Sequence, residues 1–284
     1  MATAVVDDVD LDALLAERRR GPGRAAKAWA VVWPKLVAVG LFVGIWQVIV
    51  WTGWKSEVVL PSPFTVFDGL IHNLSDLTQA AAVTLRRAVL GFAVAILIGW
   101  VIGVSVARVR VLRAGVGSMI TGLQTMPSVA WFPLAIVLFS LSPNAILFVI
   151  ILGAAPSIAN GIIDGIDNVP PVLLRAGRVL GAKGLTNLRY VVLPAALPSV
   201  MSGLKQGWAF AWRSLLAGEL ITTLGGHPGL GQMLSNSAAN ADYVELYEAM
   251  IVLFVIGVVV DALFFGTTLR RIRRRYGLID AAAS

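Results

Sequence analysis

Long apolar runs separated by short polar connections dominate the 284-residue chain. Each run is about 20 residues long, the length of helix that crosses the roughly 30 Å hydrocarbon core of a bilayer. The pattern therefore predicts an all-α integral membrane protein with six transmembrane helices. We expect these spans at residues 36–54, 88–107, 119–141, 144–163, 199–223 and 246–268. They form one membrane domain (35–270), preceded by a polar, flexible cytoplasmic segment (1–34) and followed by a basic cytoplasmic tail (271–284).

Prolines mark the third run and its end. Pro127 and Pro133 lack a backbone N–H, so we expect them to break or kink this span. Only Ser142 and Pro143 separate the third run from the fourth. Such a tight link predicts that these two spans are antiparallel neighbours.

The basic residues predict the orientation. If the N-terminus is cytoplasmic, 18 of the 23 Lys and Arg residues fall in cytoplasmic segments and three fall outside. This bias follows the positive-inside rule and places both termini in the cytoplasm. Arg86 and Arg87 fit least well, and we expect them to snorkel from the outer end of the second span.

Composition excludes several classes of protein. Hydrophobic residues make up 57% of the chain and charged residues 14%, whereas soluble domains carry about 25% charged residues. The chain has no cysteine, no His/Asp/Glu cluster with metal-ligand spacing and no G-x-x-x-x-G-K-[ST] phosphate loop. We therefore expect no enzyme chemistry, no bound metal and no ATP site here. The net charge of +7 is attributed to membrane orientation rather than to nucleic-acid binding.

The connection between the fourth and fifth runs (164–198) is too long for a simple turn and is cytoplasmic by the charge bias. An amphipathic helix is predicted over 172–180, followed by Gly181 and a second short helix that ends near Tyr190. Such a hairpin is suited to docking a cytoplasmic partner. A passive amphipathic connector on the lipid interface fits the same pattern.

The fifth run holds three charged residues, Lys205, Arg213 and Glu219. Charges inside a span are costly and usually face a cavity or a partner. Lys205 lies near the cytoplasmic end, where we expect it to snorkel. Arg213 lies deeper, and two interpretations stay open: its guanidinium binds an oxyanion on a solute path, or it forms a structural ion pair. Glu219 lies too far around the helix to pair with Arg213 on the same helix.

Further polar residues join Arg213 as candidates for a solute path. A proline break frees carbonyl groups that can line a cavity, although a kink satisfied by neighbouring helices fits as well. The full set of candidates is Gln124, Thr125, Ser128, Arg213, Ser214 and Glu219.

Glycines spaced four residues apart predict close helix packing. They occur as the pairs Gly40/Gly44, Gly99/Gly103, Gly161/Gly165 and Gly203/Gly207. A glycine-rich stretch at 226–231 is interpreted as a tight turn outside the membrane.

The cytoplasmic connection also carries a recognisable motif. It reads Arg175-Ala176-Gly177, three residues, Gly181, nine residues, and Val191-Val192-Leu193-Pro194. This resembles the signature E-A-A-x3-G-x9-I-x-L-P of permease subunits of bacterial ABC importers, with the spacing intact. Arg175, Gly177 and Val191 depart from the signature residues.

Three other stretches resemble the sulfonate/nitrate/taurine branch of that family. They are 60–63 (Leu-Pro-Ser-Pro), 126–135 and 211–219. The resemblance implies the MetI-like architecture of a type I ABC importer permease in the bacterial inner membrane. It also implies a second permease copy, two cytoplasmic ATPase subunits that bind ATP and Mg²⁺, and an extracytoplasmic substrate-binding protein.

The resemblance further implies which residues couple the permease to the ATPase. They are Arg175, Ala176, Gly177, Arg178, Leu180, Gly181, Ala182, Lys183, Leu185, Leu193 and Pro194. The implied solute is a small anion, an aliphatic sulfonate or taurine, with nitrate, bicarbonate or a vitamin precursor as alternatives. A remoter alternative is an ion-driven transporter, which would need acidic coupling residues inside the spans.

Overall fold

The computed structural model describes residues 24–221 and 228–275, and within these ranges the regular elements are all helical. The chain divides into two compact units, Met1–Phe64 and Thr65–Ser284. In the first unit, α2 (Arg24–Trp51) starts twelve residues before the start of the predicted first span and ends three residues before the end of that span. Ala-rich sequence after Gly23 explains the early start, since alanine is the strongest helix former. The remainder of the predicted N-terminal segment, residues 1–23, lies outside the described residues.

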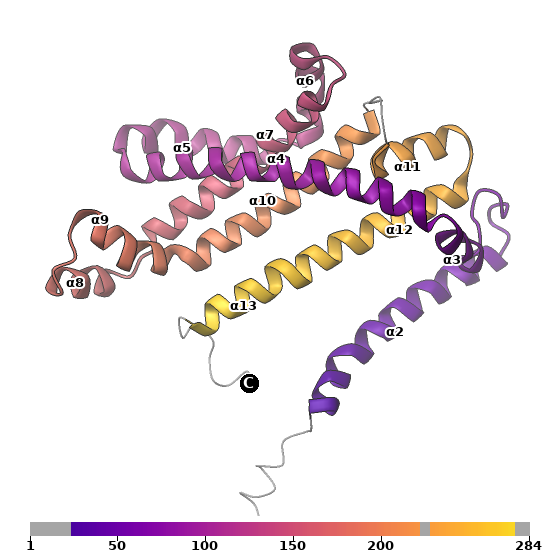
Figure 1. Ribbon diagram of the computed structural model, residues 1–284, viewed down its shortest axis with the longest axis horizontal. Helices are drawn as coiled ribbons and strands as arrows, with labels where there is room; N and C mark the ends of the chain where they lie inside the picture. The colour runs from indigo at the N-terminus through magenta and orange to yellow at the C-terminus, as the bar shows by residue number, and fades with distance from the viewer. Residues whose placement is uncertain (1–23, 222–227, 276–284) are drawn as a thin grey trace, which may run out of the picture. The chain divides into compact units, whose positions relative to one another are not determined.

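The second unit holds the other elements (Figure 1). They are α3 (Pro63–His72, beginning at the unit boundary), α4 (Leu74–Arg108), α5 (Arg110–Thr125), the 3₁₀ turn η1 (Ser128–Trp131), α6 (Phe132–Phe139), α7 (Pro143–Asp167), α8 (Pro171–Val179), α9 (Gly184–Asn187), the π-helical η2 (Leu188–Val192), α10 (Leu193–Ile221), α11 (Leu230–Ala239), α12 (Tyr243–Val259), the π-helical η3 (Val260–Phe265) and α13 (Gly266–Arg275).

Helix α7 forms the centre of this unit and packs against both α4 and α10 (Figure 1). Glycines set the spacing, as predicted for three of the four pairs; among the described residues, a Cβ on Gly40 or Gly44 would meet nothing within 4 Å. A Cβ on Gly103 would lie 2.9 Å from the Ala159 carbonyl oxygen. A Cβ on Gly161 would lie 2.6 Å from the Gly203 Cα. Backbones therefore touch directly along both helix pairs, which is the close approach that glycine permits.

The third predicted span is broken, as expected at Pro127. Helix α5 ends at Thr125, Met126 is extended, and the chain continues through η1 into α6 with a bend of 104°. Pro133 does not contribute to this break. It lies in the first turn of α6, where its missing N–H would have no partner in any case.

Within the described residues, four helices are long and apolar enough to cross a membrane, or five if the bent pair counts as one span. They are Val32–Trp51, Leu74–Arg108, Pro143–Asp167 and Tyr243–Ile272, and the bent pair is Val111–Thr125 with Ser128–Phe139. Helix α10 is not among them although it has 29 residues, because its middle carries Lys205, Gln206 and Arg213. The six-span count and the cytoplasmic termini stay predictions.

Several helices begin before the predicted spans, α4 and α10 among them. Helix α4 starts at Leu74 rather than 88, because buried Leu77, Ala80 and Thr84 extend its helical periodicity. Helix α10 starts at Leu193 rather than 199. It takes Pro194 into its first turn, where proline is tolerated, and continues through Pro198.

We expect Gly161→Ala to destabilise the protein by about 1–3 kcal/mol, since the added methyl group meets backbone that cannot rotate away. The measurement is the melting temperature of the purified protein in detergent. Gly115→Ala is the matched control, because a Cβ there meets nothing within 4 Å. Equal melting temperatures for the two variants would contradict the packing described here.

Candidate functional site

The predicted cytoplasmic hairpin is present and has a defined turn. Helix α8 ends in a Schellman motif: the Gly181 N–H donates to Arg178 O (3.1 Å) and the Ala182 N–H donates to Gly177 O (2.8 Å). Gly181 has a φ of +80°, in the left-handed region that suits glycine. The backbone conformation of this turn therefore explains why glycine, the signature residue, stands at position 181.

Two departures from the signature meet at one contact. A Cβ on Gly177 would lie 2.8 Å from Val191 Cγ2 and 3.2 Å from Asn187 Oδ1. Helix α8 thus lies closer to η2 than an alanine would allow. Relative to the signature, Gly177 lacks the methyl group of alanine and Val191 lacks one carbon of isoleucine, so both sides of the contact are smaller. The spacing of the motif alone does not predict this contact.

The exposed tip of the hairpin is apolar, and basic residues lie near it. Leu180 and Leu185 are 85% and 82% exposed, and Val179 beside them is also exposed. The same hairpin carries four exposed basic residues: Arg175, Arg178, Lys183 and Arg189. None of them forms an ion pair with a described acidic residue. Exposed large apolar side chains with a polar rim are typical of a protein-binding surface.

The hairpin is joined to the membrane helices without a break. The π-helical η2 runs directly into α10, whose first residues are Leu193 and Pro194. π-helical segments occur often at functional sites. A force applied to the hairpin would therefore act on α10.

Helix α10 has two different faces. Its buried face carries Gly203, Gly207, Ala211, Ser214 and Gly218, which pack against neighbouring helices. Its exposed face carries Ser202, Gln206 and Arg213, positions that fall on one side of a helix. These three polar residues of α10 thus lie on a side that other described helices leave open.

Arg213 is exposed, and its guanidinium lies 5.5 Å from the centre of the Phe210 ring. Among the described residues it has no carboxylate partner. The structure therefore keeps its guanidinium available for an anion.

The polar residues near the break are mostly occupied. Gln124 Nε2 donates to Ser157 Oγ, and Asn160 Nδ2 donates to Gln124 Oε1, both at 2.8 Å. Thr125 Oγ1 donates to Gly122 O within its own helix. Ser157 and Asn160 were not predicted, although a lone Asn in an apolar run is a signal that could have found one of them.

Ser128 and Ser214 come together at Gly153 of α7. A Cβ on Gly153 would lie 2.6 Å from Ser214 Oγ and 3.7 Å from Ser128 Cβ. The Ser214 hydroxyl is buried and has no hydrogen-bond partner in the described part of the chain. Arg213, the adjacent residue, lies on the exposed face, so the structure does not place all candidate path residues together.

Lys205 forms an ion pair that the sequence did not predict. Its Nζ lies 3.0 Å from Asp261 Oδ1, and the two side chains are 43% and 53% exposed. Asp261 lies in the π-helical η3 of the last predicted span. The pair links α10 to that span beside the polar face.

Glu219 is fully buried in a hydrogen-bonded cluster at the far end of α10. Arg87 Nη1 lies 2.7 Å from Glu219 Oε1, while Thr84 Oγ1 and the Gly231 N–H donate to Oε2 at 2.9 and 3.0 Å. The Leu230 N–H donates to Thr84 Oγ1 at 2.8 Å. The carboxylate thus sits at the N-terminus of α11, where the helix dipole favours negative charge.

This cluster corrects two expectations. Arg87 does not snorkel, because Glu219 holds its guanidinium. Gly229 and Gly231 belong to the start of α11 rather than to a simple turn, and a Cβ on Gly231 would lie 2.5 Å from Glu219 Cβ. Residues 226–227 of the predicted turn lie outside the described residues. With both oxygens bonded inside the protein, Glu219 has the surroundings of a structural anchor.

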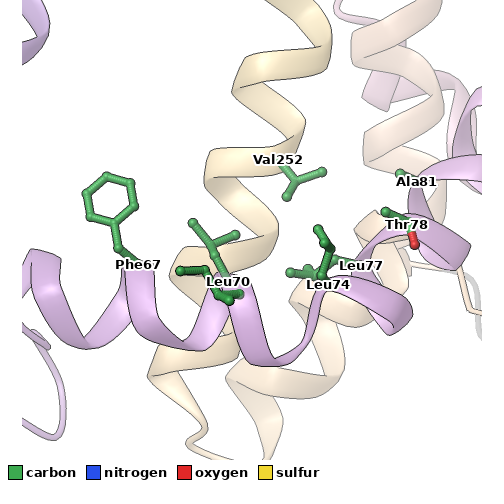
Figure 2. Close-up of a pocket in the computed structure, with 8 residues that line it drawn as sticks. Phe67, Leu70, Leu74, Leu77, Thr78, Ala81 and Val252 are labelled. Carbon is green, nitrogen blue, oxygen red and sulfur yellow. The ribbon is translucent and has the colours of Figure 1, made fainter.

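A groove of about 430 Å³ lies between α3, the start of α4 and α12 (Figure 2). Of its eight lining residues only Thr78 has a polar side chain, and that hydroxyl donates to Ser75 O. The groove offers no charge to an anionic solute and suits apolar groups.

Comparison with known proteins identifies the family. Residues 95–276 match the binding-protein-dependent transport system inner membrane component. The chain belongs to this family. It is a multi-pass inner-membrane permease subunit of an ABC transporter and not an enzyme, and such a permease works with an ATPase and a binding protein.

Several relatives of this permease have named solutes. The chain is 29% identical to the putative aliphatic sulfonates transport permease of Bacillus subtilis, over 86% of this chain and 87% of that protein. It is 27% identical to the taurine transport system permease of Escherichia coli, over 86% and 90%. It is 28% identical to the bicarbonate transport system permease of Synechococcus elongatus, over 73% of each chain.

Solved structures confirm the fold class. The permease is similar to a chain of the inward-facing methionine ABC transporter, with a TM-score of 0.59 and 20% identity over 70% of this chain and 97% of that chain. A chain of an amino acid ABC transporter has a TM-score of 0.57 and 19% identity, over 74% of this chain and 98% of that one. The fold is therefore that of a MetI-type permease, as predicted.

We expect Glu219→Gln to lower the stability of the permease by about 3–5 kcal/mol, because it removes one charge of a buried ion pair and leaves Arg87 uncompensated. Thermal unfolding in detergent measures the effect. Asp68→Asn, at a carboxylate whose side chain is 74% exposed, is the control and should change little. A Glu219→Gln variant as stable as that control would show that the cluster does not hold the helices together.

Proposed function

We propose that two identical copies of this permease form the path by which a small anion, an aliphatic sulfonate or taurine, enters the cell. An extracytoplasmic binding protein delivers the solute, and two ATPase subunits, which bind the ATP and Mg²⁺, drive the cycle. The names of the relatives from Bacillus subtilis and Escherichia coli support this solute class.

The solute proposal rests on Arg213, whose guanidinium has no carboxylate partner among the residues that the structure describes. A charged group in mid-span costs about 2.5–3.5 kcal/mol on insertion scales and normally faces water or a partner. The exposed face of α10, with Ser202, Gln206 and Arg213, is therefore a candidate wall of the aqueous path. A guanidinium donates two parallel hydrogen bonds to an oxyanion, as a sulfonate group requires.

A second candidate solute is a smaller planar anion such as bicarbonate or nitrate. The bicarbonate permease of Synechococcus elongatus supports it. Arg213 would bind either class, so uptake assays with both classes of solute decide between them.

The proposed ATPase-docking surface is the tip of the hairpin, defined by Val179, Leu180 and Leu185. These side chains are exposed to an extent that a cytoplasmic surface would not keep without a partner. The basic residues of the hairpin would face acidic groups on the ATPase. Because η2 continues into α10, movement of the ATPase would be transmitted to the helix that carries Arg213.

The double variant Leu180→Ala/Leu185→Ala should weaken ATPase binding at least about tenfold, since each buried leucine contributes about 1.5–3 kcal/mol. Co-purification of the ATPase with tagged permease measures this. Both residues are exposed, so the permease should still fold and insert. Leu97→Ala/Val101→Ala is the control, with two similarly exposed residues on α4. Full ATPase recovery with the hairpin variant would refute the docking surface.

Arg213→Gln should reduce uptake of the anionic solute by about ten- to a hundredfold, the effect of losing a charge-assisted hydrogen bond of about 1.5–3 kcal/mol. Assembly with the ATPase should be unchanged. Uptake of radiolabelled taurine or an alkanesulfonate in cells measures the effect, with Arg86→Gln, at an exposed arginine of α4, as the control. Loss of assembly together with uptake would indicate a structural role for Arg213 instead.

A further inference from the structure

The last helix of the permease changes from apolar to strongly basic along its length. Helices α12, η3 and α13 follow each other without a gap from Tyr243 to Arg275 and form one continuous rod (Figure 1). The stretch Tyr243–Ile272 is apolar enough to cross a membrane. Its final turns hold five arginines within Arg270–Arg275. An apolar rod thus ends in a dense positive charge on the predicted cytoplasmic side.

The apolar part of this rod presents a strip to its surroundings. Val255, Val259 and Leu263 are exposed and lie four residues apart, on one side of the helix. Phe254, Val258 and Phe264 widen the strip and are exposed as well. In a multi-pass membrane protein, an exposed strip of this kind contacts lipid acyl chains.

The arginines continue the strip rather than turning away from it. Arg270, Arg271 and Arg274 are exposed and follow Leu263 at near-helical spacing. None of the three forms an ion pair with a described acidic residue. Their positive charge is therefore not neutralised within the described part of the protein, and it lies at the end of the stretch that is apolar enough to cross a membrane.

We infer that α13 and the strip above it form a binding site for an anionic phospholipid. The acyl chains lie along Val255, Val259 and Leu263, and the phosphate lies between the guanidinium groups of Arg270, Arg271 and Arg274. Arginine matches the phosphate with two parallel hydrogen bonds. A net negative headgroup is selected, because the arginines repel the cationic amine of a zwitterionic lipid.

At α13 itself, a protein partner fits less well than a lipid headgroup does. Protein interfaces have an apolar centre and a charged rim. The exposed surface of α13 offers arginines without exposed large apolar side chains among its described residues. The hairpin tip has the opposite arrangement, with leucines at its centre. This inference is independent of the solute and of the site where the ATPase docks.

The test titrates full-length permease in neutral detergent with phosphatidylglycerol or phosphatidylcholine and counts bound lipids by native mass spectrometry. Wild type should bind phosphatidylglycerol at least about tenfold more tightly, and 0.5 M salt should weaken this binding by screening. In Arg270→Gln/Arg271→Gln/Arg274→Gln the affinity should fall on the order of a hundredfold, since each basic residue near the surface contributes about a factor of five.

The matched control is Arg175→Gln/Arg178→Gln/Lys183→Gln, which removes three charges from the hairpin and should retain wild-type lipid binding. If the arginine-to-glutamine variant fails to fold, Arg270→Lys/Arg271→Lys/Arg274→Lys replaces it, with an intermediate affinity expected. Equal binding of the two lipids by wild type would overturn the inference. So would equal losses in the α13 and hairpin variants, or an α13 variant that keeps its lipid and loses the ATPase.

Discussion

The buried carboxylate of Glu219 is the constraint on which the arrangement of this permease depends. It joins α10 to α4 through Arg87 and Thr84, and to α11 through the Gly231 N–H. An unpaired charge in this position would be strongly destabilising, so the three helices must come together for the group to be buried at all. Gly229 and Gly231 give the carboxylate the space it occupies.

Helix α10 connects this anchor to the hairpin. From Leu193 to Glu219 it extends about 39 Å at 1.5 Å per residue. One end continues into η2 and the hairpin, the other end is held by Arg87, and the exposed polar face with Arg213 lies between them. In the proposed mechanism, the ATPase moves the hairpin end while the anchored end stays bound to α4 and α11. Such a lever would change the exposure of Arg213 during the cycle.

The sequence predicted what depends on local pattern and missed what depends on distant partners. Apolar runs, the break at Pro127, the helix before Gly181 and the glycine contacts of α7 all follow from local spacing, and the structure contains them. The Arg87–Glu219 pair joins residues 132 positions apart, so no periodicity could reveal it. Lys205 and Asp261 are also far apart in the sequence, and they meet only when the helices pack together. The early start of α4 was missed because its first three turns are too polar to resemble a span.

Docking of the ATPase on the hairpin can be tested directly, because the chain has no native cysteine and a single introduced thiol is unique. The measurement is cross-linking of Leu180→Cys permease to its co-purified ATPase with a short thiol–amine reagent, followed by mass spectrometry. Docking at the hairpin tip predicts a permease–ATPase adduct at this position and none at Phe64→Cys, an exposed site on the predicted outer side. An assembled complex in which Leu180→Cys forms no ATPase adduct would contradict it.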